Sequence, residues 1–223
     1  MRQSLLTPIA ELDLAAKLLD AAADALLQGR MALAGELIAK ADFTEITDYA
    51  RRLVGKMTPE VHRHTRRPKC LPKSERDPTR MPTQLEQNAL FARDGWRCRF
   101  CGIKVICKSA RSAFTRIFPI EAHWTSLEFQ RHSAFYAMAS SLDHVVPHGR
   151  GGKNELPNFV TACYCCQFGR GEWTLEEVEL MDPRNREPVR DSWDGLCRIA
   201  GVQPNKPLHP TLGSGASRLP SAG

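Results

Sequence analysis

Apolar residues recur at three- and four-residue intervals through the first quarter of the chain. Leucine, isoleucine and alanine follow this spacing between residues 4 and 27, Gly29 interrupts it, and a second apolar run covers residues 31–38. A third short helix is expected to end near Gly55. The pattern predicts a helical N-terminal region over residues 1–55. Such a region suits a helical bundle, or a surface that docks a second copy of the chain or another protein.

The next stretch, residues 56–82, changes character because five prolines forbid a long helix. Lysine and arginine outnumber acidic residues here, so we expect a mostly extended, basic linker. One interpretation is a strap that neutralises phosphates, since lysine and arginine contacts release counterions from nucleic acid. A solvated linker without a ligand fits the same composition.

Helical patterns return after the linker. Thr83 is followed three residues later by Glu86, the arrangement of a capping box, so a helix is expected over residues 83–94. Residues 108–141 form a predicted helical insertion within a domain that spans residues 83–200. The remaining residues, 201–223, are rich in proline, glycine and serine and predict a disordered tail.

Charge and hydropathy limit the partners and the cellular compartment that can be expected for the chain. The 223 residues carry a formal net charge of +6, which fits a polyanionic partner such as nucleic acid. We expect no membrane partner, because no run of 18 apolar residues occurs. Charged residues interrupt the N-terminal apolar stretch, so it does not resemble a secretion signal. The eight cysteines are therefore expected in a reducing cytoplasm.

Two cysteine pairs have the spacing of metal ligands. Cys98 and Cys101 form the first pair, and Cys163 and Cys166 form the second after 61 intervening residues. Paired cysteines at this spacing in a reducing compartment usually bind a metal, and four thiolates satisfy a closed tetrahedral zinc site. Cys165 is an alternative ligand, although the spacing favours its neighbours. The sequence thus predicts a structural Zn²⁺ that joins the two segments flanking the insertion.

Between the cysteine pairs lies a set of residues suited to phosphodiester hydrolysis. The dipeptide Asp143-His144 precedes Pro147 and a glycine-rich loop, and Asn158 follows the loop. A neutral imidazole can act as general base near pH 7, and a carboxylate is a hard ligand for Mg²⁺ or Mn²⁺. Asn158 can fix the loop and so aim His144. The non-catalytic alternative is a zinc-ribbon scaffold that carries an Asp-His pair on its surface by chance.

The stretches WRCRFC and LDHVVPHGRGGKNELPNFVTACYCCQFGRG resemble the zinc-containing ββα-metal type of the HNH endonuclease family. The resemblance implies an α+β fold with a small zinc-held ββα core, accompanied here by the helical N-terminal region and the helical insertion. It also implies a single divalent catalytic cation and DNA as the substrate. The resemblance further implies that Asp143 is a metal ligand, that His144 is the general base and that Asn158 orients the loop.

One position departs from the family pattern. Where the family usually has Asn or His directly after the last cysteine, as the second protein ligand of the catalytic metal, this chain has Gln167. The longer side chain shifts the ligand oxygen, so weakened or lost activity is the consequence to test. Arg170, Arg150 and His148 are the predicted phosphate contacts. Three hypotheses follow: an HNH endonuclease, a non-catalytic zinc-stabilised nucleic-acid-binding module, and an interaction protein that docks through its N-terminal helices.

Overall fold

The computed structural model describes residues 1–54 and 68–202. The predicted tail from residue 203 onward, the linker residues 56–67 and residue 55 lie outside the described ranges. Within those ranges none of the helices combines the length and the apolar character that a membrane span requires. Helices and a small antiparallel sheet occur together, which confirms the α+β class at the level of secondary structure.

Three helices form the N-terminal layer: α1 (Ala10–Leu27), α2 (Met31–Lys40) and α3 (Thr44–Val54). Gly29 separates the first two with a φ of +73°, a conformation that glycine adopts without steric cost. The first helix begins at Ala10, six residues later than the apolar pattern suggested. Before it, Arg2 forms a parallel bridge with Leu180 in the C-terminal part of the chain.

The next three helices lie before and between the two cysteine pairs in the sequence. Helix α4 (Gln84–Arg93) begins at Thr83 with the predicted capping box, in which Thr83 and Glu86 satisfy each other's backbone N–H groups. Helices α5 (Lys108–Ile117) and α6 (Ser133–Ala137) lie between the two cysteine pairs. Short 3₁₀ turns complete the connections: Lys73–Glu75, Glu128–Gln130, His148–Arg150, Leu156–Asn158, Pro183–Asn185 and Cys197–Ile199.

A β-hairpin followed by a helix lies at the centre of the molecule. Strand β1 (Ser140–His144) pairs antiparallel with β2 (Phe159–Cys163), and helix α7 (Tyr164–Arg170) follows β2 directly. The register places Asp143 opposite Val160 and His144 opposite Phe159. This hairpin is the sheet formed among the described residues. Strand, loop, strand and helix follow one another along the chain in the ββα order that the motifs predict.

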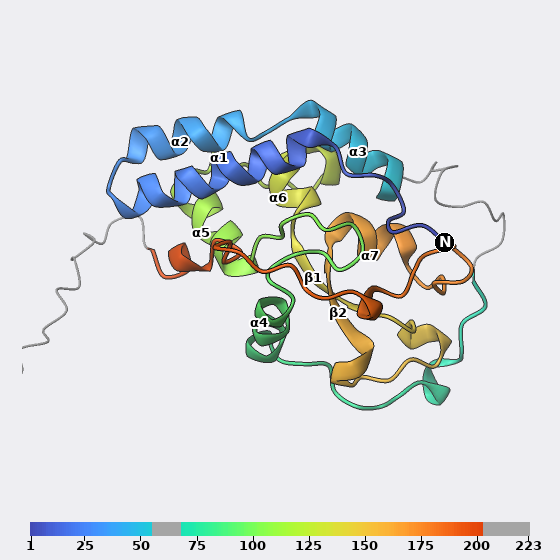
Figure 1. Cartoon of the computed structure of the whole chain (residues 1–223). Helices are drawn as coiled ribbons and strands as arrows, with labels where there is room; N and C mark the ends of the chain where they lie inside the picture. The colour runs from blue at the N-terminus through green and yellow to red at the C-terminus, as the bar shows by residue number, and fades with distance from the viewer. Residues whose placement is uncertain (55–67, 203–223) are drawn as a thin grey trace, which may run out of the picture.

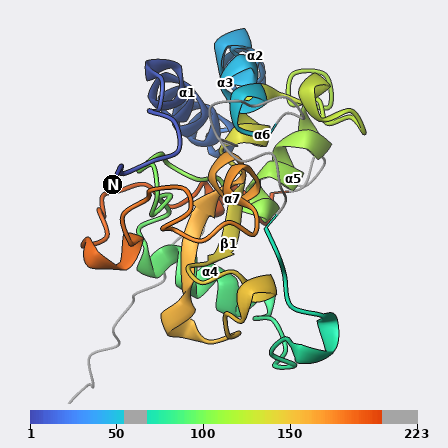
Figure 2. The ribbon, with the colours of Figure 1, turned by 90° about the vertical axis from the view of Figure 1, so that its right-hand side faces the viewer.

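Figures 1 and 2 show how the layers are stacked. Helices α1, α2 and α3 lie together on one side, α5 and α6 lie between them and the hairpin, and α4 lies beyond the hairpin. One continuous hydrophobic core joins these parts, since buried side chains of α1, such as Leu19, belong to the same cluster as Phe135 of α6 and Phe159 of β2. The N-terminal helices are therefore packed onto the ββα unit.

His132 is a buried link between the N-terminal layer and α6. Its Nε2 donates to the Ile38 carbonyl at 2.9 Å, and its Nδ1 accepts the Phe135 N–H at 3.5 Å. Both contacts suit the neutral imidazole, and burial lowers the pKa of His132 below 6.5.

That pKa shift predicts a pH-dependent stability. Because unfolded histidine takes up its proton near pH 6.5 and folded His132 does so only at lower pH, the unfolded state binds more protons as the pH falls. The stabilising contribution is present above pH 6.5 and is lost below it. Urea unfolding at about pH 7.5 and about pH 5.5 measures this contribution. Between these two pH values the wild type should lose more free energy of unfolding than His132→Asn, which keeps a helix-capping side chain. Equal losses in the two proteins would contradict this assignment.

Candidate functional site

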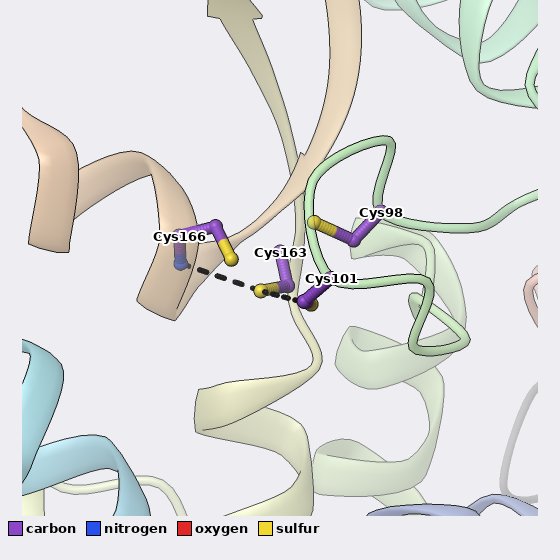
Figure 3. Close-up of side chains that lie close together, drawn as sticks. All are labelled: Cys98, Cys101, Cys163 and Cys166. Atoms are coloured by element: carbon purple, nitrogen blue, oxygen red, sulfur yellow. Dashed lines mark hydrogen bonds between the residues drawn. The ribbon is translucent and has the colours of Figure 1, made fainter. Parts of the chain in front are cut away.

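The two cysteine pairs meet at one point beside the hairpin (Figure 3). Cys98 and Cys101 come from the turn after α4, Cys163 ends β2, and Cys166 lies in the first turn of α7. All four sulfur atoms lie within 4.8 Å of one another, and three of the four side chains are buried. The geometry brings together residues that the insertion separates by more than sixty positions in the sequence.

The sulfur cluster has the dimensions of a tetrahedral metal site. The Sγ atoms of Cys101 and Cys163 are 3.8 Å apart, and a tetrahedron with metal–sulfur bonds of about 2.3 Å has edges of about 3.8 Å. The Cys166 N–H donates to Cys163 Sγ at 3.3 Å, a contact that favours a thiolate. Cys165 does not join the group; it is fully buried, and burial raises the pKa of its thiol. The four residues fit one metal ion.

His144 ends β1, half-buried, and turns toward the loop between the strands. Its Nε2 donates to Asn154 Oδ1 at 2.6 Å, and its ring packs edge-on against Phe159 with 4.8 Å between centroids. The amide nitrogen of Asn154 donates to the Thr79 carbonyl, so the amide oxygen faces the ring. This contact leaves Nδ1 as the proton-accepting nitrogen of the neutral imidazole. Burial, more than any neighbouring charge, lowers the pKa of His144, which favours that neutral form near pH 7.

Asn158 closes the loop that follows His144. Its Oδ1 accepts the Val146 N–H at 2.8 Å, and its Nδ2 donates to the carbonyls of Val146 and Lys153, each at 3.0 Å. Gly152 makes this closure possible, because a Cβ at that position would lie 1.8 Å from the Val146 oxygen. The buried Asn158 side chain thus holds both ends of the loop.

Asp143 turns to the opposite side of β1 and pairs with Arg170 of α7. Arg170 NH2 lies 2.8 Å from Asp143 Oδ1 and Nε lies 3.3 Å from Oδ2, and the same guanidinium donates to the carbonyls of His144, Val145 and Trp173. The Arg170 side chain is 1% exposed and that of Asp143 is 8% exposed. Burial raises the pKa of Asp143 to about 6, although Arg170 acts in the opposite direction. This is a buried ion pair inside the ββα unit.

Gln167, the other predicted ligand of a catalytic cation, is also bound to protein groups. Its Oε1 accepts from the Ser141 hydroxyl, and its Nε2 donates to the Leu142 carbonyl at 2.9 Å. With Asp143 paired to Arg170, the oxygens of both predicted ligands already accept hydrogen bonds from protein groups. In the described part of the chain, the one group of three or more candidate ligands close enough to share a metal is the four-cysteine cluster. The residues present do not fit a Mg²⁺ or Mn²⁺ ion in this arrangement.

The three predicted phosphate contacts have protein partners. Arg170 lies inside the fold, and Arg150 forms two hydrogen bonds with the Glu177 carboxylate at 3.0 and 3.1 Å. His148 Nε2 donates to the Asp77 carbonyl at 3.0 Å. Arg170, a predicted phosphate contact, is therefore buried inside the fold, and the other two side chains are half-buried at the edge of the loop.

Asn154 was not among the predicted site residues, and residues 68–82 were predicted only as part of a basic linker that could neutralise phosphates. The Asp77 carboxylate accepts the backbone N–H of Asn154 at 2.6 Å, and the Leu71 N–H donates to the Gly149 carbonyl at 2.7 Å. This part of the linker therefore lies against the loop of residues 145–158. A local signal existed for Asn154, because an amide side chain directly after the glycine-rich loop lies within reach of His144. No local signal marks Asp77, which is 67 residues from His144 in the sequence.

No family model, curated protein or solved structure matches this chain in the comparisons with known proteins. The functional assignment therefore depends on the residues and on the geometry described above.

Proposed function

We propose that the protein is a zinc-stabilised ββα endonuclease of the HNH type that hydrolyses DNA phosphodiester bonds. The observation that carries the proposal is the placement of His144. A half-buried, neutral imidazole stands at the end of β1, held by Asn154, beside a loop that Asn158 closes. The four-cysteine cluster joins the segments that support this arrangement.

The metal in the four-cysteine site is proposed to be Zn²⁺. Four thiolates in a tetrahedral arrangement favour Zn²⁺, with an iron–sulfur centre as the chemical alternative. A hairpin of two five-residue strands with one seven-residue helix has little core of its own. A closed metal site compensates for this by contributing binding free energy to folding. The proposed ion is structural, since all four of its coordination positions are occupied by protein.

His144 supplies the chemical step of the proposal. In phosphodiester hydrolysis the water oxygen bonds to phosphorus as the bond from phosphorus to the leaving oxygen breaks. A general base takes the proton of the water, Nδ1 of His144 is the nitrogen that accepts it, and the leaving oxygen takes a proton from solvent. Asn154 fixes the ring and its tautomer through Nε2, and Asn158 fixes the backbone that follows. No step is assigned to a catalytic cation, because Asp143 and Gln167 are bound to protein groups.

Cleavage of supercoiled plasmid tests the proposal. The wild type should nick or linearise the plasmid, and His144→Ala should reduce the rate by about 10²- to 10⁴-fold, the usual contribution of a general base. Reactions with and without added Mg²⁺ or Mn²⁺ determine whether a cation is required. Omitting the ions is a better control than EDTA, which would also remove the proposed zinc. A folded, zinc-loaded His144→Ala protein that cleaves at the wild-type rate would overturn the mechanism.

A specific observation favours a second candidate, a non-catalytic zinc-stabilised nucleic-acid-binding module. Both predicted ligands of the catalytic cation are engaged, Asp143 with Arg170 and Gln167 with Ser141 and Leu142. This candidate predicts salt-dependent DNA binding by a protein that leaves the plasmid intact under every ion condition. DNA as the partner, a homodimer or protein partner at the N-terminal helices, and a cytoplasmic location stay predictions under both candidates.

A further inference from the structure

A cavity rich in arginine opens beside the start of β2, outside the residues discussed so far. Its volume is about 360 Å³, and its walls come from three segments: residues 93–99, residues 156–160 and residues 184–188. Four arginines line it, accompanied by two carboxylates, which gives the wall a net charge of +2: Arg93, Arg99, Arg184 and Arg186 with Asp94 and Glu187. A concave surface with this excess of guanidinium groups is suited to an anion.

Two of the four arginines are neutralised by neighbouring carboxylates. Arg93 lies against the buried Asp94, with Nε–Oδ1 at 2.9 Å and NH2–Oδ2 at 3.1 Å. Arg184 pairs with Asp182 and is 45% exposed at the rim. These two groups shape the wall and still present hydrogen-bond donors toward solvent.

The other two, Arg99 and Arg186, form ion pairs with none of the carboxylates among the described residues. Each donates to the backbone carbonyl of the other, and Arg99 also donates to the Pro183 carbonyl at 2.8 Å. The Nε atom of Arg186 is buried and has no acceptor. Burial lowers the pKa of Arg99; Asp94 and Glu187 act against this shift, and Arg186 and Arg93 add to it. Two adjacent like charges cost free energy, and an anion in the cavity would offset that cost.

The position of the cavity relates it to His144. Leu156, Pro157 and Phe159 line its wall, and the Phe159 ring is the one that packs edge-on against His144. The loop that ends at Asn158 therefore borders both the cavity and the proposed catalytic histidine. A polyanion that passes His144 would bring a neighbouring charged group to the arginines.

We propose that this cavity binds a phosphate of a nucleic-acid backbone through Arg99 and Arg186, with Arg93 and Arg184 at its rim. Guanidinium groups match phosphate oxygens with paired hydrogen bonds, and such contacts position a backbone without reading its sequence. The choice of nucleic acid as the source of the phosphate rests on the proposed function, whereas the anion site itself does not require hydrolysis.

Binding of a fluorescent double-stranded oligonucleotide, followed by anisotropy over a series of salt concentrations without added divalent ions, tests the proposal. Arg186→Gln removes the buried donor, and Arg184→Gln removes a rim charge whose exposure makes the change easy to tolerate. The matched control is Arg51→Gln, an arginine of α3 that is 53% exposed and does not line the cavity. Zinc content and melting temperature establish that each variant is folded.

Each cavity variant should weaken binding to two unrelated sequences by the same factor. Each should also reduce the slope of log K against log salt by about 0.9 for each lost phosphate contact, while Arg51→Gln should behave as the wild type. Folded Arg184→Gln and Arg186→Gln proteins with the wild-type affinity and slope would overturn the site.

Two further measurements separate the sources of phosphate and the two proposals. If inorganic phosphate raises the melting temperature of the wild type but not of Arg186→Gln, while DNA binding is the same in both, the nucleic-acid assignment is wrong. The His144→Ala protein should bind DNA with the full salt slope even though it does not cleave. If His144→Ala loses cleavage but retains binding, the result therefore does not contradict the proposed phosphate site.

Discussion

Replacing Cys163 with Ala is expected to abolish metal binding and to unfold the ββα unit. The sulfur of Cys163 lies 3.8 Å from that of Cys101 and accepts the Cys166 N–H, so it belongs to both halves of the site. Metal binding of this type contributes about 10–16 kcal/mol to folding in small zinc domains. A whole domain is stable by only about 5–15 kcal/mol. The free energy lost with the metal should therefore exceed the free energy of unfolding of the domain.

Cys165→Ala is the matched control for this experiment. Cys165 lies in the first turn of α7, two residues after Cys163, and is as buried as Cys163, yet it is not part of the sulfur cluster. Metal analysis should give one zinc per chain for the wild type and for Cys165→Ala, and none for Cys163→Ala. Near-UV circular dichroism should show the loss of fixed tertiary packing only in the Cys163 variant. A metal-free wild type that melts at the same temperature as the loaded protein would contradict the structural role.

Chelation provides the same test without a mutation. Removing the metal should separate α7 from the turn that carries Cys98, and the hairpin should lose its anchor at the end of β2. The N-terminal helices should retain part of their far-UV signal, because α1 and α2 pack against each other. Adding Zn²⁺ back should restore the native spectrum.

Local sequence signals predicted the parts of the structure that depend on short spacings. The Thr83–Glu86 capping box starts α4 as expected, and the x-x spacing of each cysteine pair is a property of a single turn. The order of Asp-His, glycine-rich loop, Asn158 and cysteine pair indicated the hairpin and the helix that follows it. These features are encoded within a few residues, so their physical cause is visible in the sequence.

The remaining features depend on contacts between distant segments. The apolar spacing of residues 4–9 fits a helix, yet α1 begins only at Ala10, and Arg2 before it pairs through its backbone with residues 179–181. Arg170 has the chemistry of a surface phosphate contact, but α7 turns it inward onto Asp143. The arginine cavity combines segments that lie nearly ninety positions apart. Burial and long-range partners decide these cases, and neither can be read from a local pattern.

Arg170→Met is expected to destabilise the protein by about 3–5 kcal/mol, the usual cost of leaving one member of a buried ion pair without its partner. Methionine keeps much of the side-chain volume, so the main change is the loss of the cation and its hydrogen bonds. Asp143, which is 8% exposed, would then have to remain buried as a carboxylate without a counterion or be protonated. Urea unfolding of the zinc-loaded protein measures the difference.

Two further variants distinguish the stability contributed by the buried ion pair from that contributed by side-chain packing. Arg150→Met removes an arginine that also forms a bidentate pair, but the side chains of Arg150 and Glu177 are 23% and 32% exposed. That change should cost about 1 kcal/mol or less. Adding Asp143→Asn to Arg170→Met should recover part of the lost stability, because a neutral amide needs no buried cation. If Arg170→Met costs no more than Arg150→Met, the buried pair is not a structural element.

The same series bears on the choice between hydrolysis and binding. A large cost for Arg170→Met means that the guanidinium provides the positive charge that Asp143 requires, so a divalent ion cannot take that place without displacing it. A small cost means that Asp143 can exchange the guanidinium for an ion, which is the property that metal-dependent hydrolysis needs. Mn²⁺ binding to the wild type and to Arg170→Met, followed by electron paramagnetic resonance, distinguishes these outcomes. Binding that appears only in the variant would identify Arg170 as the group that excludes the ion.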